Sequence, residues 1–195
     1  LQLQHGLRVA WEPVKEMPWM EPTAVPEGAK TFTDLNRSFL TDDAEFVESD
    51  TGELRRDWAR GVFTINTPRS QGASGWLGEQ EELSLSDVSF AIDTRKATVI
   101  VSSLDGEPIA RSDRMLISSA ARTAAVGPQR WNRQVVAEPV TGTVSVRSDA
   151  GSMTLAPLRG DGTEGPAVKL EKQDGAFRAP LQAEHKTLWW VLRTE

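Results

Sequence analysis

Apolar and polar residues alternate with a period of two through almost all of the chain from Leu83 to its end. The alternating runs have the length of strands, and turn signals separate them roughly every eight to twelve residues. No long segment has the period of an amphipathic helix. The pattern predicts an all-β fold, a β-sandwich or jelly roll of about ten antiparallel strands, and it argues against a doubly wound α/β fold.

Two hairpins are expected on the basis of local turn chemistry. The turn at Ala59-Arg60-Gly61 joins the runs 53–58 and 62–67, and Asp105-Gly106 joins two later apolar runs. In the run 62–67, Phe63 and Ile65 share the face that we expect to lie on the core. The other runs expected to contain strands are 83–93, 96–104, 109–122, 130–140, 142–148, 152–158, 167–173, 175–180 and 186–193.

A polar, glycine-rich segment, RSQGASG at 69–75, follows Pro68 and is expected to be a loop that ends at Trp76. An indole ring beside Arg69 and Gln71 is suited to stack on a sugar while the neighbouring side chains hydrogen-bond its hydroxyls. The alternative is that Trp76 is a half-buried lid on the core.

Four prolines lie within the first 30 residues, so a regular helix is excluded there. We expect residues 12–30 to form an extended strap on a domain surface, and residues 31–195 to form the sandwich. The chain begins without Met and without the pattern of a signal peptide. We therefore expect it to be a piece of a longer protein.

Composition restricts the classes of partner and chemistry. A net charge of −6 argues against nucleic acid as a partner, because phosphate binding needs a basic surface. No apolar run is long enough to span a membrane, and no membrane partner is expected. The absence of cysteine excludes disulfides and thiolate chemistry.

No catalytic motif is present, and no catalytic residue is assigned. His5 and His185 lie far apart in the sequence, and there is no G-x-S-x-G elbow, P-loop, dinucleotide fingerprint or H-E-x-x-H motif. Paired carboxylates on the sandwich would make a small hydrolase, an alternative that stays open. We expect no cofactor. The acidic segment 41–50 lacks the spacing of a calcium loop and is typical of a solvated face, with a structural calcium as the alternative.

Three stretches of the chain carry a resemblance to a known family: 49–78, 102–122 and 186–193. They resemble the C-terminal β-sandwich domain that follows the TIM barrel in many bacterial glycoside hydrolases of the cellulase and β-galactosidase-like type. The matching features are a strand at 62–67, a Thr-Pro-Arg turn at 67–69, a small-residue loop ending in an aromatic at 70–76, a Ser-Leu-Asp-Gly hairpin at 103–106 and a long strand at 109–122. The resemblance covers residues 31–193.

This resemblance implies a secreted or periplasmic bacterial protein, and residues 1–30 would be the end of a parent catalytic domain. The barrel itself is not in this sequence, so its catalytic carboxylates match no residue here. A non-catalytic carbohydrate-binding module is the leading hypothesis, with a polysaccharide or oligosaccharide and the parent barrel as partners and a monomeric state. The alternative is a structural domain without a ligand that packs on the barrel.

Tryptophans beside polar side chains are the candidate carbohydrate-binding positions, because an indole ring stacks on a pyranose face. For each of them a place in the core is the competing interpretation. Trp189 and Trp190 must point to opposite faces of the last strand, so one of them is expected in the core. The candidates are Trp76 with Arg69 and Gln71, Trp131 with Asn132 and Arg133, and, as second choices, Trp58 and Trp19.

Overall fold

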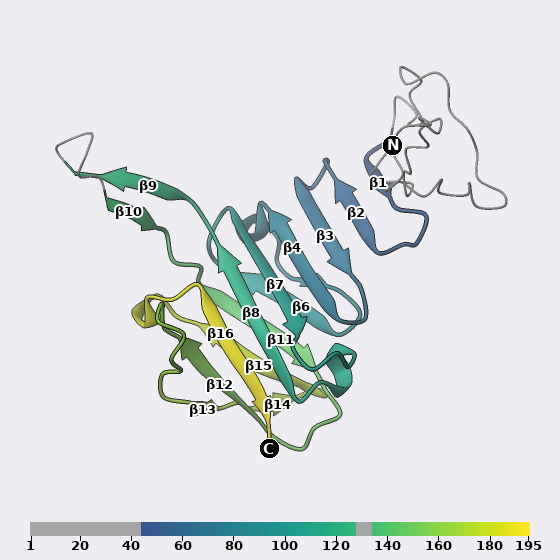
Figure 1. Ribbon diagram of the computed structural model, residues 1–195. Coiled ribbons are helices and arrows are strands. Elements are labelled where there is room, and N and C mark those ends of the chain that lie inside the picture. The colour runs from purple at the N-terminus through teal and green to yellow at the C-terminus, as the bar shows by residue number, and fades with distance from the viewer. Residues whose placement is uncertain (1–43, 128–133) are drawn as a thin grey trace, which may run out of the picture.

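The computed structural model of the protein describes residues 44–127 and 134–195. These residues form two antiparallel sheets that pack face to face, with a projecting two-stranded hairpin and three short 3₁₀ helices (Figure 1). No α-helix occurs in the described part of the chain. The all-β sandwich predicted from the sequence is confirmed. The strap expected over residues 12–30 lies outside the described residues.

The larger sheet has nine strands and the smaller one has five. The order in the larger sheet is β1 (Phe46–Glu48), β2 (Leu54–Asp57), β3 (Val62–Asn66), β4 (Ser70–Gly75), β7 (Ala97–Ser103), β8 (Arg114–Ala120), β16 (Trp189–Thr194), β12 (Met153–Leu158) and β13 (Val168–Lys169). The order in the smaller sheet is β14 (Lys172–Gln173), β15 (Ala176–Leu181), β11 (Gly142–Arg147), β6 (Val88–Ile92) and β5 (Leu83–Ser84).

The remaining elements are short. Strands β9 (Thr123–Val126) and β10 (Gln134–Ala137) pair with each other and stand away from the sandwich (Figure 1). The 3₁₀ helices are η1 (Leu77–Glu79), η2 (Ile109–Arg111) and η3 (Ala183–His185).

More strands are present than the sequence pattern predicted, because single runs divide between strands. The run 83–93 divides into β5 and β6 at a turn, and these two strands pair with each other. The run 167–173 divides at the buried Leu170, where the chain leaves β13 in the larger sheet and enters β14 in the smaller one. An apolar residue at such a crossing fills the core between the sheets.

The core lies between the two sheets and is built from alternate residues of each strand. Val99 and Val101 of β7 face Val144 and Val146 of β11 within one cluster, and Trp190 of β16 is its largest member. The strand positions between these residues point outward, as the period of two requires. Burial of this apolar surface is the main stabilising contribution to the fold.

Strand β3 turns toward the solvent the face that we expected to lie on the core. Val62 lies in the core, so Phe63 and Ile65 are on the outer face of the larger sheet, opposite Ser74 and Gly72 of β4. The prediction that Phe63 and Ile65 lie on the core was wrong. The apolar pattern of this run identified a strand but not the side on which the second sheet packs.

The glycine-rich segment after Pro68 is strand β4, not a loop. It is hydrogen-bonded on both sides, to β3 and to β7. A Cβ at Gly72 would lie 2.7 Å from Cγ1 of Ile100 and 2.9 Å from the carbonyl oxygen of Val99, so only glycine fits at that position. The small residues thus allow a neighbouring side chain to lie over an interior strand.

Gln71 of β4 connects the two sheets from inside the core, where its exposed fraction is 0%. Its Oε1 accepts hydrogen bonds from the backbone N–H groups of Asp87 at 2.8 Å and Val88 at 3.1 Å. Its Nε2 donates to Oδ2 of Asp87 at 2.8 Å. Every polar atom of the amide therefore has a protein partner, which a buried amide requires.

The connection between β7 and β8 is organised around the carboxylate of Asp105. The two strands pair as predicted, but residues 104–113 and helix η2 join them, in place of a tight hairpin turn. The carboxylate accepts hydrogen bonds from the hydroxyls of Ser103 and Ser112 and from the backbone N–H groups of Glu107, Asp113 and Arg114. The tight Asp-Gly turn occurs instead at Asp174-Gly175, where φ is +51° and +82°.

These hydrogen bonds control the titration of Asp105. Loss of solvent around the carboxyl group acts to raise its pKa, but the hydrogen bonds from Ser103, Glu107, Asp113 and Ser112 outweigh this effect and hold the pKa well below its ordinary value. The charged form is therefore favoured in the folded state.

We predict that Gln71→Ala lowers the free energy of unfolding by about 3 kcal/mol, because two backbone N–H groups and a carboxylate lose their partner. A loss of this size lowers the melting temperature by about 6 to 12 °C. Calorimetry checks this, with the exposed Gln182→Ala as control. Equal melting temperatures for the two variants would contradict the role given to Gln71.

We predict that Asp105→Ala destabilises the fold at neutral pH and that its effect becomes smaller in acid. A carboxyl group whose pKa is lower in the folded chain stabilises the fold above its unfolded-state pKa of about 3.9, and this contribution is lost as the pH falls towards the folded value. Urea unfolding between pH 7 and pH 2 measures the difference from the unsubstituted chain. The control is Asp149→Ala, an exposed carboxylate. A difference that stays constant below pH 4 would contradict the assignment.

Candidate functional site

Trp58 and Trp76 lie at the same end of the larger sheet, and both are partly exposed, at 42% and 37%. Trp58 is in the turn between β2 and β3, where the N–H of Gly61 donates to its carbonyl oxygen. Trp76 follows β4, and its own N–H donates to the carbonyl oxygen of Gly61. Gly61 thus connects the two segments that present the indole rings.

The ring of Trp76 packs closely on Gly61. A Cβ at Gly61, where φ is +65°, would lie 2.4 Å from Cδ1 of Trp76. Gln80 holds the same corner together, since its Nε2 donates to the carbonyl oxygen of Trp76 at 3.2 Å and its Oε1 accepts from Nε of Arg60 at 2.9 Å. The indole is therefore fixed at one edge and by its backbone, which lowers the entropy lost when a ligand contacts it.

Two cationic side chains from the turn before β7 surround the ring. The guanidinium carbon of Arg95 and Nζ of Lys96 lie 5.0 Å and 5.3 Å from the centre of the Trp76 ring, within the range of a cation–π contact. Nε of Arg95 also donates to Oε1 of Glu79 at 2.9 Å. We call Trp58, Arg60, Trp76, Gln80, Arg95 and Lys96 the aromatic corner.

Arg69 and Gln71 are not part of this corner. Arg69 lies in the turn before β4, whereas Trp76 follows the end of β4, so the six-residue strand separates them by about 20 Å. Gln71 is fully buried with its amide paired, as described above, and has no free group for a sugar hydroxyl. The predicted grouping of Trp76 with Arg69 and Gln71 was wrong, because the segment between them is a strand.

Four other predicted positions lie outside the described residues: Trp19, Trp131, Asn132 and Arg133. The last strand bears out the expectation for its two tryptophans. Trp190 is in the core, with 1% of its surface exposed, and Trp189 is 41% exposed on the outer face of the larger sheet.

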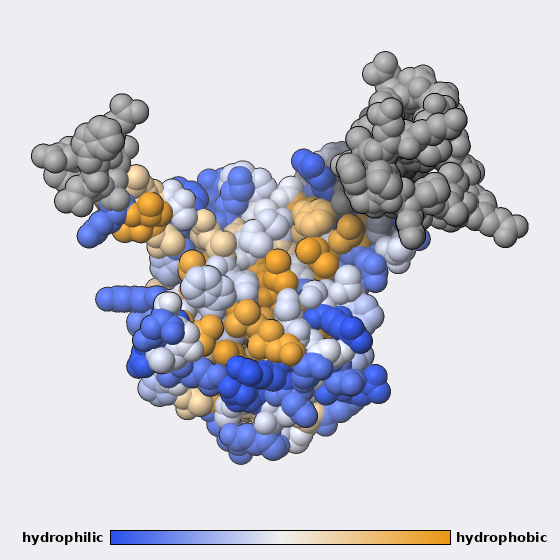
Figure 2. Space-filling view, in the orientation of Figure 1, coloured by the Kyte–Doolittle hydropathy of each residue, from blue (hydrophilic) through white to orange (hydrophobic). Residues whose placement is uncertain are grey.

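The outer face of the larger sheet carries a continuous apolar area, which Figure 2 shows across the middle of the molecule. Its residues alternate with core residues on adjacent strands, and two of them, Ala156 and Val191, are buried although they point away from the core cluster. At its border, Arg114 and Arg193 form ion pairs with Glu164. The area consists of Ile65, Ile100, Leu116, Ala156, Leu158, Trp189 and Val191.

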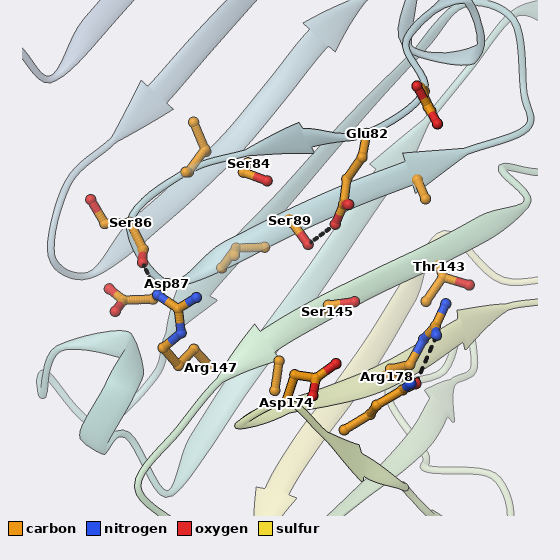
Figure 3. A pocket seen from close by; sticks show the side chains of 16 residues that line it. Glu82, Ser84, Ser86, Asp87, Ser89, Thr143, Ser145, Arg147, Asp174 and Arg178 are labelled. Carbon is orange, nitrogen blue, oxygen red and sulfur yellow. Dashed lines mark hydrogen bonds between the residues drawn. The ribbon is translucent and has the colours of Figure 1, made fainter.

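The outer face of the smaller sheet is polar and hollowed (Figure 3). A trough of about 410 Å³ lies over β5, β6, β11 and β15. Its floor is made of small side chains that alternate with core residues, and its walls carry acidic residues and two arginines. The lining includes Glu81, Glu82, Ser84, Asp87, Ser89, Ala91, Thr143, Ser145, Arg147, Gln173, Asp174, Ala176 and Arg178.

Sequence reasoning did not find this trough. The signal in the sequence is that Ser89 and Ser145 occupy outward positions between buried apolar neighbours on β6 and β11. Small polar residues at such positions indicate an exposed sheet face but not its shape. Ser84 and Ser89 pair within the short β5–β6 hairpin, but Ser145 joins them only through the pairing of β6 with β11, a strand that is distant in the chain.

Metal binding has no geometric support in the part of the chain that the structure describes. No three His, Cys, Asp or Glu side chains come together there as a metal site would require. Part of the acidic segment 41–50, where calcium was the alternative, lies outside the described residues. Among the described residues no helix is long and apolar enough to cross a membrane.

Comparisons with known proteins give no relative for this chain. No protein-family model matches it, and searches of curated proteins and of solved structures find no match.

We predict that Gly61→Ala displaces the Trp76 ring, whereas Gly52→Ala leaves it in place. Both glycines have a similar positive φ, so both variants lose about 1 to 2 kcal/mol of stability. Only the methyl group at position 61 overlaps the ring, since the nearest atom to a Cβ at Gly52 is 3.9 Å away. The indole N–H signal of Trp76 in a ¹⁵N correlation spectrum, assigned with Trp76→Phe, measures the effect. An unmoved signal in Gly61→Ala would contradict this packing.

Proposed function

We propose that the chain is a non-catalytic carbohydrate-binding module of a polysaccharide-degrading enzyme, and that it binds sugar at the aromatic corner. The observation that carries the proposal is the pair of exposed tryptophans at one end of the larger sheet, of which Trp76 is held in place by Gly61. An exposed indole presents a flat apolar surface that matches the C–H face of a pyranose ring.

The side chains around the rings supply polar contacts. Arg60, Arg95 and Lys96 offer hydrogen-bond donors, and the carboxylate of Glu79 offers an acceptor beside Arg95. Sugar hydroxyls both donate and accept hydrogen bonds, so a mixture of donors and an acceptor around an aromatic ring is suited to recognise them. Because Arg95 and Lys96 lie over the ring of Trp76, a sugar that stacks on that face displaces them or uses the opposite face.

The resemblance to the β-sandwich domain of bacterial glycoside hydrolases supports the same proposal and adds its setting. By that resemblance the module is a monomeric part of a secreted or periplasmic bacterial enzyme and is joined to a catalytic TIM barrel. The polysaccharide is the substrate of that barrel, and binding by the module keeps the catalytic domain close to it.

A second candidate function is favoured by the apolar area on the outer face of the larger sheet. Exposed apolar areas of this kind mark surfaces that another protein covers. In this alternative the domain packs on the parent barrel through that area and has no ligand of its own. The two functions use different surfaces, so substitutions separate them.

We predict that affinity electrophoresis through β-glucan, xyloglucan, xylan, mannan and galactan retards the chain in at least one polymer. Trp76→Ala is expected to weaken that retardation at least about tenfold, because a buried aromatic contact dominates such an interface. Trp58→Ala is expected to weaken it less, and Trp189→Ala, an equally exposed indole on the other surface, not at all.

The outcome that overturns the proposal is the absence of retardation in every polymer by a chain with a normal melting curve. That result would favour the packing function. Retardation that Trp189→Ala abolishes and Trp76→Ala leaves unchanged would move the site from the aromatic corner to the outer face of the larger sheet.

A further inference from the structure

We propose that the trough on the smaller sheet is a second carbohydrate site, which binds a linear, uncharged oligosaccharide by hydrogen bonds without stacking. The proposal rests on the proposed function for its class of ligand, but it concerns a different surface and different residues. The trough is a hollow of about 410 Å³ in the outer face of β5, β6, β11 and β15, on the opposite layer to the aromatic corner (Figure 3).

The floor allows a ligand to approach the sheet closely. Ser84 pairs with Ser89, and Ser89 pairs with Ser145, so three hydroxyl-bearing side chains stand in a row across β5, β6 and β11. Ser145 in turn pairs with Arg178 of β15, whose guanidinium ends the row. Residues paired in this way share one face of the sheet. Because neighbouring strands lie about 4.8 Å apart, the row offers one polar group per strand at a spacing close to the length of one pyranose unit.

Several of these groups are available to a ligand. The hydroxyls of Ser84, Thr143 and Ser145 and the carboxylate of Asp174 make no hydrogen bond or ion pair within the described residues. They lie beside groups that are already fixed. The hydroxyl of Ser89 donates to Oε1 of Glu82 at 2.6 Å, a hydrogen bond that is dashed in Figure 3. Nη1 of Arg178 donates to Oε1 of Gln173 at 3.0 Å.

The walls carry both hydrogen-bond donors and hydrogen-bond acceptors, and contacts within the fold hold these groups in place. Nη1 of Arg147 donates to the carbonyl oxygen of Ser86 at 3.3 Å, which places its guanidinium at one side of the trough. Asp87 at the same side is oriented by the buried amide of Gln71. Asp174 is held in the tight turn between β14 and β15. A ligand with hydroxyls on both edges finds a partner on each wall.

Charge and polarity exclude the other classes of ligand. The lining has four carboxylates against two guanidinium groups, which disfavours an anion. Within the described residues no three acidic side chains converge as a cation site needs. A floor of Ser, Thr and Ala, with Leu85 and Val88 as the larger apolar residues of the lining, offers little to an apolar molecule, and no aromatic residue is among the described residues that line the trough. An uncharged ligand rich in hydroxyls, recognised at its edges, is the class that fits.

The experiment is calorimetric titration of the full chain with cellohexaose, xylohexaose and mannohexaose, with hexagalacturonate as the anionic comparison. We expect one neutral hexasaccharide to bind and the anion to bind at least about tenfold more weakly. The double variant Ser89→Ala, Ser145→Ala removes two hydroxyls without adding bulk to the floor and is expected to weaken binding about tenfold. Ser118→Ala, which removes a serine hydroxyl from the outer face of the larger sheet, is the matched control.

Arg178→Gln provides a second variant on an exposed position, where folding is not at risk, and it is expected to weaken binding as well. Binding that survives Trp58→Ala and Trp76→Ala but not the trough substitutions supports the trough site. Binding lost with Trp76→Ala and unchanged in the trough variants overturns it and leaves the proposed function intact. The trough proposal is also overturned when none of the neutral hexasaccharides binds, or when hexagalacturonate binds as tightly as they do.

Discussion

The unequal width of the two sheets is the constraint on which the rest of the structure depends. Five strands cannot cover nine, so part of the larger sheet extends past β5, and within residues 44–127 and 134–195 no sheet lies opposite the inner side of that part. On that inner side the guanidinium of Arg55 lies 3.7 Å from the centre of the Phe46 ring and pairs with Glu48 and Asp57. Charged and aromatic side chains replace the core there. The turn that carries Trp58 joins β2 and β3 in the same extension.

The two sheets expose outer faces of opposite character, and this is what separates the functional alternatives. The larger sheet presents an apolar area suited to a protein partner, and the smaller sheet presents a polar trough suited to a ligand rich in hydroxyls. The aromatic corner lies at one end of the larger sheet, between segments that Gly61 brings together. The proposed carbohydrate-binding module would use the aromatic corner and the trough, and the alternative structural domain would use the apolar area.

The all-β class and most strands could be predicted from the sequence, because apolar and polar residues alternate along a strand that buries one of its two faces. The sequence could not show which face of β3 meets the core, since Val62 and Ile65 are equally apolar and only the position of the second sheet distinguishes them. Gln71 was misassigned for a related reason: a glutamine among small residues suggests a loop unless the partners of both its amide atoms are known. Ser145 joins Ser84 and Ser89 in the trough only through the long-range register of β6 with β11, and no local pattern reveals that register.

Hydrogen–deuterium exchange of the full chain, with and without a hexasaccharide that binds it, tests the central claim that carbohydrate binds to this sandwich at defined surfaces. Ligand contact slows local opening of the backbone, so protected peptides identify the site. We expect slower exchange at 57–61 and 76–80 when the aromatic corner is occupied, and at 84–91 and 143–147 when the trough is occupied. Protection confined to 98–102, 114–118 and 189–193, over the apolar area, or no protection with any hexasaccharide, would contradict the central claim.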